Sequence, residues 1–111
     1  MHDRVIVIIA TAETAKARTG AMYALNALKH GWLEDVKLDL FGPAERLFLE
    51  DDDFQGLVRQ FMDMAKTPLA CRAISDKERT SERLMDLGLD VQYVGSPISE
   101  AIREGYLPMV W

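Results

Sequence analysis

The sequence has few of the residues on which disulfide-stabilised and zinc-binding proteins depend. Its 111 residues include one cysteine and two histidines. A single cysteine cannot form an internal disulfide, and an unpaired thiol is typical of a reducing compartment, so we expect a cytoplasmic protein. His2 lies in the amino-terminal tail and His30 ends an expected helix, which leaves no zinc-ligand set, and we expect no metal site.

Long hydrophobic runs and an excess of positive charge are also missing. The apolar run over residues 5–10 is too short for a signal peptide, and no stretch approaches the length of about 20 residues that spans a bilayer. The net charge of −5 argues against the large basic face that nucleic acids or anionic membranes require, although a small basic pocket can lie within an acidic protein. We therefore expect neither a nucleic-acid partner nor a membrane.

The loop after the first apolar run lacks the glycines of a phosphate-binding loop. It reads T-A-E-T-A-K-A-R-T-G, with no glycine before Gly20. It matches neither the P-loop nor the dinucleotide-binding pattern, which weakens a nucleotide-binding interpretation and predicts no cofactor. Capping of the following helix by Thr11 or Thr14 is the function we expect for this loop.

Short strands and helices alternate along the chain. We predict strands at residues 5–10, 36–41, 67–73, 91–94 and 106–111. Strands separated by helices indicate crossover connections, so the sequence predicts a three-layer α/β/α fold with a mainly parallel five-stranded sheet, in a single domain over residues 1–111. The first strand is continuously apolar and should be buried on both faces. Pro108 should confine the last strand to an edge.

Several residues predict where the helices start and stop. Asp51, at the head of an acidic triplet, suits a helix cap better than a metal ligand. Ser75 and Glu78 form a capping box for a helix that we expect to reach Gly88. Ser96 should cap the last helix.

Cys71 is the main candidate for a chemically reactive residue. It stands at the expected carboxyl end of the third strand, where doubly wound sheets place their sites. Arg72, Lys77 and Arg79 follow it, and positive charge stabilises a thiolate. A free cysteine is also among the most commonly buried residues and behaves as a small apolar side chain. Both interpretations stay open on the residues alone.

A resemblance to a known family covers nearly the whole chain. Its motifs are V-I-V-I-I-A-T, L-K-H-G, V-K-L-D-L-F-G-P-A-E-R-L, P-L-A-C-R-A, D-L-G-L-D-V-Q-Y-V-G and G-Y-L-P-M-V-W. Taken in order and with their spacing, these segments are similar to the DsrE/DsrF-like proteins. The resemblance implies a three-layer α/β/α domain of the DsrE/F-like type that assembles into dimers, trimers or hexamers.

The resemblance also implies a function for Cys71, which falls on the position of the cysteine that carries sulfur in the sulfur-relay members. We therefore expect a sulfur carrier or sulfurtransferase-like protein, in which Cys71 accepts and donates sulfane sulfur as a persulfide. Arg72, Lys77 and Arg79 would stabilise the thiolate, and the expected partners are copies of this chain and another sulfur-carrier protein. The alternative is a non-catalytic oligomeric module that binds a small ligand or a partner, with a structural Cys71.

Overall fold

A five-stranded parallel sheet forms the centre of the molecule. The computed structural model describes residues 3–111 and is α/β throughout. The strands are β1 (Arg4–Ile9), β2 (Asp35–Leu40), β3 (Leu69–Cys71), β4 (Asp90–Gln92) and β5 (Leu107–Val110). All neighbouring strands pair in parallel, in the order β4-β3-β2-β1-β5. The predicted fold class is confirmed.

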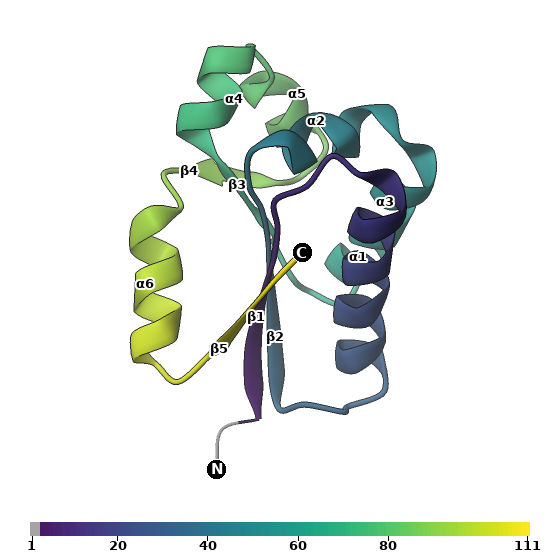
Figure 1. Cartoon of the computed structure of the whole chain (residues 1–111), viewed down its shortest axis with the longest axis vertical. Coiled ribbons are helices and arrows are strands. Elements are labelled where there is room, and N and C mark those ends of the chain that lie inside the picture. The colour runs from purple at the N-terminus through teal and green to yellow at the C-terminus, as the bar shows by residue number, and fades with distance from the viewer. Residues whose placement is uncertain (1–2) are drawn as a thin grey trace.

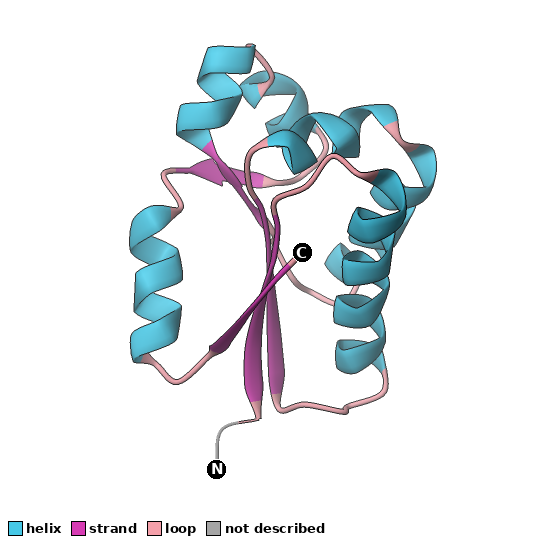
Figure 2. Cartoon of the chain, in the orientation of Figure 1, coloured by secondary structure: helices cyan, strands magenta, loops and turns pink. Residues whose placement is uncertain are grey.

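Helices cover both faces of the sheet and one of its ends. They are α1 (Thr14–Lys29), α2 (Pro43–Glu50), α3 (Asp52–Met62), α4 (Arg72–Glu78), α5 (Ser81–Asp86) and α6 (Gly95–Arg103). Figure 1 shows α1 and α3 on one side of the sheet and α6 on the other, with α2, α4 and α5 gathered near the carboxyl ends of the strands. Figure 2 shows the same layers coloured by secondary structure, with the strands in magenta between the cyan helices. Within residues 3–111 no helix is both long and apolar enough to cross a bilayer.

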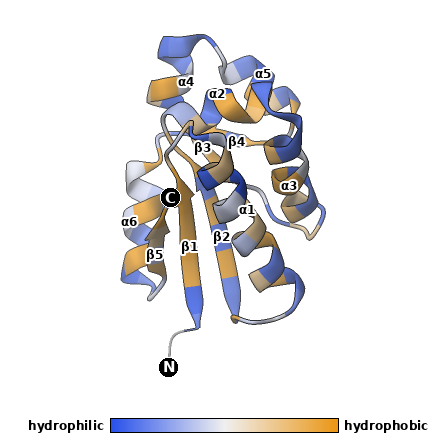
Figure 3. Ribbon diagram, turned by 45° about the vertical axis from the view of Figure 1, so that its right-hand side comes forward, coloured by the Kyte–Doolittle hydropathy of each residue, from blue (hydrophilic) through white to orange (hydrophobic). Residues whose placement is uncertain are grey.

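The strand β1 is buried on both faces, as its sequence predicts. Val7 and Ile9 pack in the larger core beneath α1 and α3, and Ile6 and Ile8 pack in a smaller core beneath α6. In Figure 3 β1 is apolar along most of its length, while β2 alternates between apolar and polar residues. The alternation in β2 follows from its two faces, since successive side chains of a strand point in opposite directions.

The strand β5 lies at the edge of the sheet, which confirms the position predicted from Pro108. Pro108 pairs with Ile6 on the β1 side, and among residues 3–111 no strand neighbours the other side of β5. Leu107 is 61% exposed and Val110 is 66% exposed. The outer edge of the sheet therefore presents apolar side chains.

The cap of α1 differs from the predicted one. The Glu13 carboxylate accepts the backbone N–H groups of Ala15 and Lys16 at 3.1 and 3.0 Å, so Glu13 and neither threonine caps the helix. Thr11 instead accepts the backbone N–H of Glu13 at 3.0 Å. The expected cap of α3 is confirmed, because Asp51 accepts the backbone N–H of Phe54 at 2.8 Å.

The segment after β3 also differs from its prediction, because the expected single helix is broken in two. The helix α4 starts at Arg72, directly after the strand, and places Ser75 inside a helix rather than at a cap. Arg79 ends α4 with a left-handed backbone, at φ 59°, and α5 follows from Ser81. The last helix also starts early, since α6 begins at Gly95 and Ser96 lies within its first turn.

Candidate functional site

The carboxyl ends of β2 and β3 meet at the part of the fold where parallel sheets place their sites. The end of β2 leads into α2, and the end of β3 leads directly into α4. Cys71 is the last residue of β3 and the N-cap of α4, which confirms its predicted position at the end of a strand. It is a free thiol, but its residue is only 6% exposed.

A buried glutamate holds the start of α4 against the start of α2. The Glu45 carboxylate accepts the backbone N–H of Cys71 at 3.2 Å, and the backbone N–H of Gly42 lies close enough to lower its pKa. Glu45 is 1% exposed, and its Oε1 atom has no hydrogen-bond partner within residues 3–111. Burial raises the pKa of Glu45 to about 7, although the two backbone N–H groups oppose the rise. Its charge therefore changes near neutral pH, next to Cys71.

Glu45 was not predicted from the sequence. An acidic residue in the first turn of a helix is normally interpreted as stabilising the helix dipole, and such residues are usually exposed. The signal that could have found it is its position three residues after Gly42, where a glutamate side chain reaches back to the residue that precedes the helix. Its contact with Cys71 joins two segments 26 residues apart, which local patterns do not predict.

The three basic residues predicted to assist Cys71 point elsewhere. Arg72 donates to the carbonyl oxygen of Val91 at 3.0 Å and lies 3.8 Å from the Asp76 carboxylate. Lys77 and Arg79 line a surface hollow that Cys71 does not line. In the described part of the chain, no hydrogen bond links the sulfur of Cys71 to any of these three side chains.

A surface hollow lies between α2 and α4 at this end of the sheet. Its volume is about 530 Å³. It is lined by Gly42, Pro43, Arg46, Ile74, Lys77, Glu78 and Arg79. Arg46 donates from two nitrogens to Glu78, at 2.8 and 2.6 Å, which joins α2 to α4 across the hollow. Three basic side chains therefore gather around one carboxylate.

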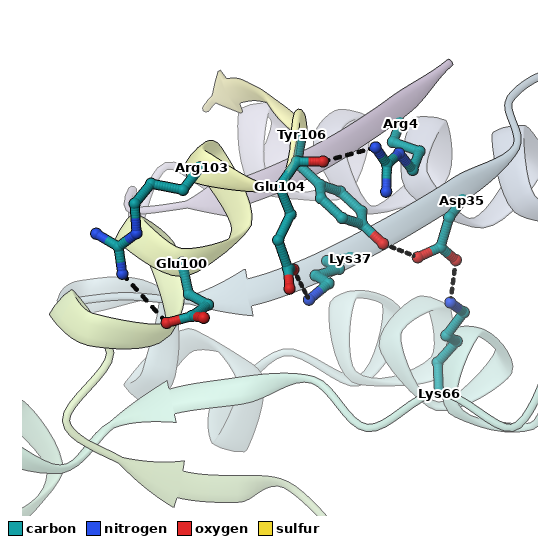
Figure 4. A network of polar contacts seen from close by, with 8 residues as sticks. All are labelled: Arg4, Asp35, Lys37, Lys66, Glu100, Arg103, Glu104 and Tyr106. Atoms are coloured by element: carbon teal, nitrogen blue, oxygen red, sulfur yellow. Dashed lines mark hydrogen bonds and ion pairs between the residues drawn. The ribbon is translucent and has the colours of Figure 1, made fainter. Parts of the chain in front are cut away.

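A second polar cluster surrounds Tyr106 near the amino ends of β1 and β2 (Figure 4). The Tyr106 hydroxyl donates a hydrogen bond to the Asp35 carboxylate, which also accepts one from Lys66. The charged groups of Arg4 and Lys37 lie 5.1 and 4.7 Å from the centre of the Tyr106 ring. Burial and the neighbouring Asp35 raise the pKa of Tyr106 to about 12. These contacts tie the start of β5 to the first two strands, and we interpret the cluster as structural.

Asp39 is a buried acid on β2 that the sequence analysis also missed. It is 2% exposed, and its Oδ2 atom has no hydrogen-bond partner in the described residues. Burial raises the pKa of Asp39 to about 6, against the attraction of Lys37. It lines a cavity of about 220 Å³ beside β2, next to the point where β2 begins to pair with β3. Its place between Leu38 and Leu40, in a strand that alternates apolar and polar residues, is typical of an exposed polar residue and gives no sign of burial.

Metal-ligating side chains do not gather in the part of the chain that the structure describes. Residues 3–111 contain no group of three or more histidine, cysteine, aspartate or glutamate side chains placed to hold an ion. The interpretation of His2 as a tail residue lies outside the described residues.

The fold defined by this sheet and its helices recurs in solved structures. The chain is similar to BT1422 of Bacteroides thetaiotaomicron, a conserved protein of unknown function, with a TM-score of 0.88 and 24% identity over 98% of this chain and 95% of that one. It is also similar to MTH1491 of Methanobacterium thermoautotrophicum, another protein of unknown function, with a TM-score of 0.61 and 18% identity over 97% and 98% of the two chains. At these identities the likeness shows the fold alone.

No family model and no curated protein matches the chain.

Proposed function

We propose that this protein is a DsrE/F-like sulfur carrier in which Cys71 accepts and donates sulfane sulfur. The observation that carries the proposal is the position of a free thiol at the carboxyl end of β3, where the first turn of α4 begins. The resemblance in sequence supports it, because it places Cys71 on the sulfur-carrying position of that family.

The chemistry needs only thiols. The Cys71 thiolate attacks the outer sulfur of a donor persulfide, R–S–SH, a new S–S bond forms to Cys71, and the donor leaves as the thiolate R–S⁻. A thiolate of the acceptor then attacks the outer sulfur of the Cys71 persulfide and takes it, which returns Cys71 to the thiolate. Each step breaks one sulfur–sulfur bond and forms another, with no net oxidation.

The burial of Cys71 sets a structural condition on this transfer. A donor must reach a sulfur on a residue that is 6% exposed, so the start of α4 must open during the reaction. The hydrogen bond from the Cys71 N–H to Glu45 holds that segment in place.

Mass spectrometry tests the proposal directly. The native protein is treated with inorganic polysulfide, and the intact mass is compared between the wild type and Cys71→Ser. The wild type should gain the mass of one or more sulfur atoms, and the added sulfur should be removed by a thiol reductant. A wild-type protein that gains no sulfur under conditions that load a control thiol protein would disprove the carrier function.

The small exposed fraction of Cys71 favours a second candidate, a binding module in which this cysteine is structural. Alkylation with iodoacetamide separates the two functions. A carrier should be alkylated in the native state at a rate within about tenfold of the rate in urea, because its site opens readily. A structural Cys71 should be modified only as the protein unfolds.

A further inference from the structure

The hollow between α2 and α4 carries an excess of positive charge on an acidic protein. Arg46, Lys77 and Arg79 line it together with one acid, Glu78, whereas the whole chain has a net charge of −5. All three basic residues are exposed. A local concentration of cations in a concave surface attracts anions even when the overall charge is negative.

We propose that this hollow binds a small molecule through its phosphate group. Neither Lys77 nor Arg79 forms an ion pair within residues 3–111, so both are available to a ligand. Arg46 is held in place by Glu78, and an arginine presents several N–H donors in a fixed plane that suits phosphate oxygens.

The shape of the hollow suits the rest of such a ligand. Pro43 and Ile74 add apolar surface beside the charged groups. The volume of about 530 Å³ is within the range of sites for small molecules, which are mostly apolar with a few placed polar groups. The hollow also adjoins the carboxyl ends of β2 and β3, through Gly42 and the start of α4.

The backbone of Arg79 is a second, independent observation. Its φ of 59° lies in the left-handed region, where a glycine would be relaxed and a larger residue is strained. A helix end of this kind normally carries glycine. Strained residues are found preferentially at functional sites, and here the strained residue is one of the two cations of the hollow that form no ion pair in the described part of the chain.

The proposal does not depend on the chemistry of Cys71, which does not line the hollow. A protein that fails to load sulfur can still bind phosphate, and a protein that loads sulfur can lack the phosphate site. The two proposals therefore stand or fall on separate experiments.

The binding test uses inorganic phosphate and glycerol 3-phosphate, with sodium chloride at equal ionic strength and glycerol as controls. The ligands are titrated while amide NMR signals and the melting temperature are followed. Both phosphates should raise the melting temperature above the chloride control and shift the amide signals of Gly42, Ile74, Lys77 and Arg79. Tighter binding of glycerol 3-phosphate identifies an organic phosphate as the better ligand, whereas equal binding identifies the free ion.

Two variants test the assignment of the site. Arg79→Gly removes both the cation and the backbone strain, so it should melt at a higher temperature than the wild type and bind phosphate about tenfold more weakly. Lys77→Gln should weaken binding by a similar factor without the gain in melting temperature. Ala65→Gly is the matched control, because Ala65 also has a positive φ, of 62°, but does not line the hollow. This variant should melt at a higher temperature than the wild type and bind phosphate equally well.

The outcomes separate clearly. Weaker binding in either variant, with unchanged binding in Ala65→Gly, supports the site. The proposal is overturned if neither phosphate exceeds the chloride control, or if both variants bind phosphate as tightly as the wild type.

Discussion

Two aspartates on β2 show how strongly the surroundings of a carboxyl group affect its pKa. Asp35 is partly buried, but the hydrogen bonds from Lys66 and Tyr106 outweigh this burial and hold its pKa below the usual value. Asp39 lies four residues further along the strand, and burial raises its pKa to about 6. The same residue type is therefore favoured as an anion at one end of the strand and as a neutral acid at the other.

The substitution Asp39→Asn should change how stability depends on pH. Between the unfolded pKa of about 4 and the folded pKa of about 6, the native state binds more protons than the unfolded state, so wild-type stability falls as the pH rises. Over the whole pH range, this difference in pKa lowers the free energy of unfolding by about 3 kcal/mol, and the loss is complete above pH 7. In urea unfolding at pH 5 and pH 8, Asp39→Asn should therefore lose less stability with rising pH than the wild type.

Asp35→Asn is the control with the opposite sign. The pKa of Asp35 is lowered in the folded state, so the ionised carboxylate stabilises the fold above the unfolded pKa, and that contribution is lost as the pH falls through the folded pKa. The asparagine variant should therefore be destabilised at neutral pH and approach the wild type in acid. Two variants with the same pH dependence would contradict the different surroundings of the two residues.

Asp51 performs two functions, which two substitutions can separate. It caps α3 through the backbone N–H of Phe54 and pairs with Arg18 of α1. The Arg18 side chain lowers the pKa of Asp51 through two hydrogen bonds, at 3.0 and 2.6 Å. Asp51→Ala should lower the melting temperature more than Asp51→Asn, because asparagine still caps a helix. Equal losses would show that the ion pair and not the cap stabilises this junction.

At the scale of elements, one glycine determines how α1 meets the carboxyl-terminal residue. A Cβ atom added at Gly20 would lie 2.7 Å from the Cγ atom of Trp111, which is too close for any real contact. Trp111 packs against the larger core, and its backbone is hydrogen-bonded to β1 through Ile8 and Ala10. The absence of a side chain at Gly20 therefore makes room for the indole ring.

The pair Gly20→Ala and Gly56→Ala tests this contact. Both glycines lie inside helices, where alanine normally adds about 0.5–1 kcal/mol of stability. None of the described neighbouring atoms lies within 4 Å of a Cβ atom built at Gly56, so Gly56→Ala should show that gain in chemical denaturation. Gly20→Ala should instead destabilise the protein by roughly 1–3 kcal/mol, because it displaces Trp111. A gain in both variants would contradict the close packing.

The sequence predicted which segments form helices and strands better than it predicted the residues at which they begin and end. The run over residues 5–10, the edge position of Pro108 and the cap at Asp51 follow from local patterns, and the structure confirms all three. The break at Arg79 was missed because only tertiary structure holds a residue other than glycine in a left-handed conformation. Ser75 and Glu78 had the spacing of a cap, but α4 begins immediately after β3.

The candidate site was predictable only in part. The topology places Cys71 at the end of β3, as expected. The positions of Lys77 and Arg79 depend on how α4 turns, and that turn directs them to the hollow with Arg46. Glu45 and Asp39 could not be identified as buried acids, because their burial depends on segments that are distant in sequence.

At the scale of the whole molecule, exposed apolar residues support the expected self-association. Trp32 is 57% exposed, and Leu107 and Val110 of the edge strand β5 are exposed as well. A free strand edge with apolar side chains invites pairing with another chain, and neighbouring subunits are a common cover.

Light scattering should therefore give a mass above the 12.5 kDa of one chain, in the form of a dimer, trimer or hexamer. Replacement of Leu107 and Val110 by lysine should lower that mass, and lysine in place of the exposed Met22 on α1 is the control. A constant mass of one chain at all concentrations would contradict the prediction.

The pairing of β5 with β1 also determines how the molecule resists a pulling force. The two strands are parallel, and Val5 lies opposite Leu107 while Ile8 lies opposite Val110. A force applied between Asp3 and Trp111 pulls β1 from its first residue and β5 from its last, so the strands are drawn past one another along their length. The hydrogen bonds between them then bear the load together instead of opening one after another. A single molecule stretched from these two positions should therefore yield abruptly, at high force, with the rate of that one shearing event setting its mechanical lifetime.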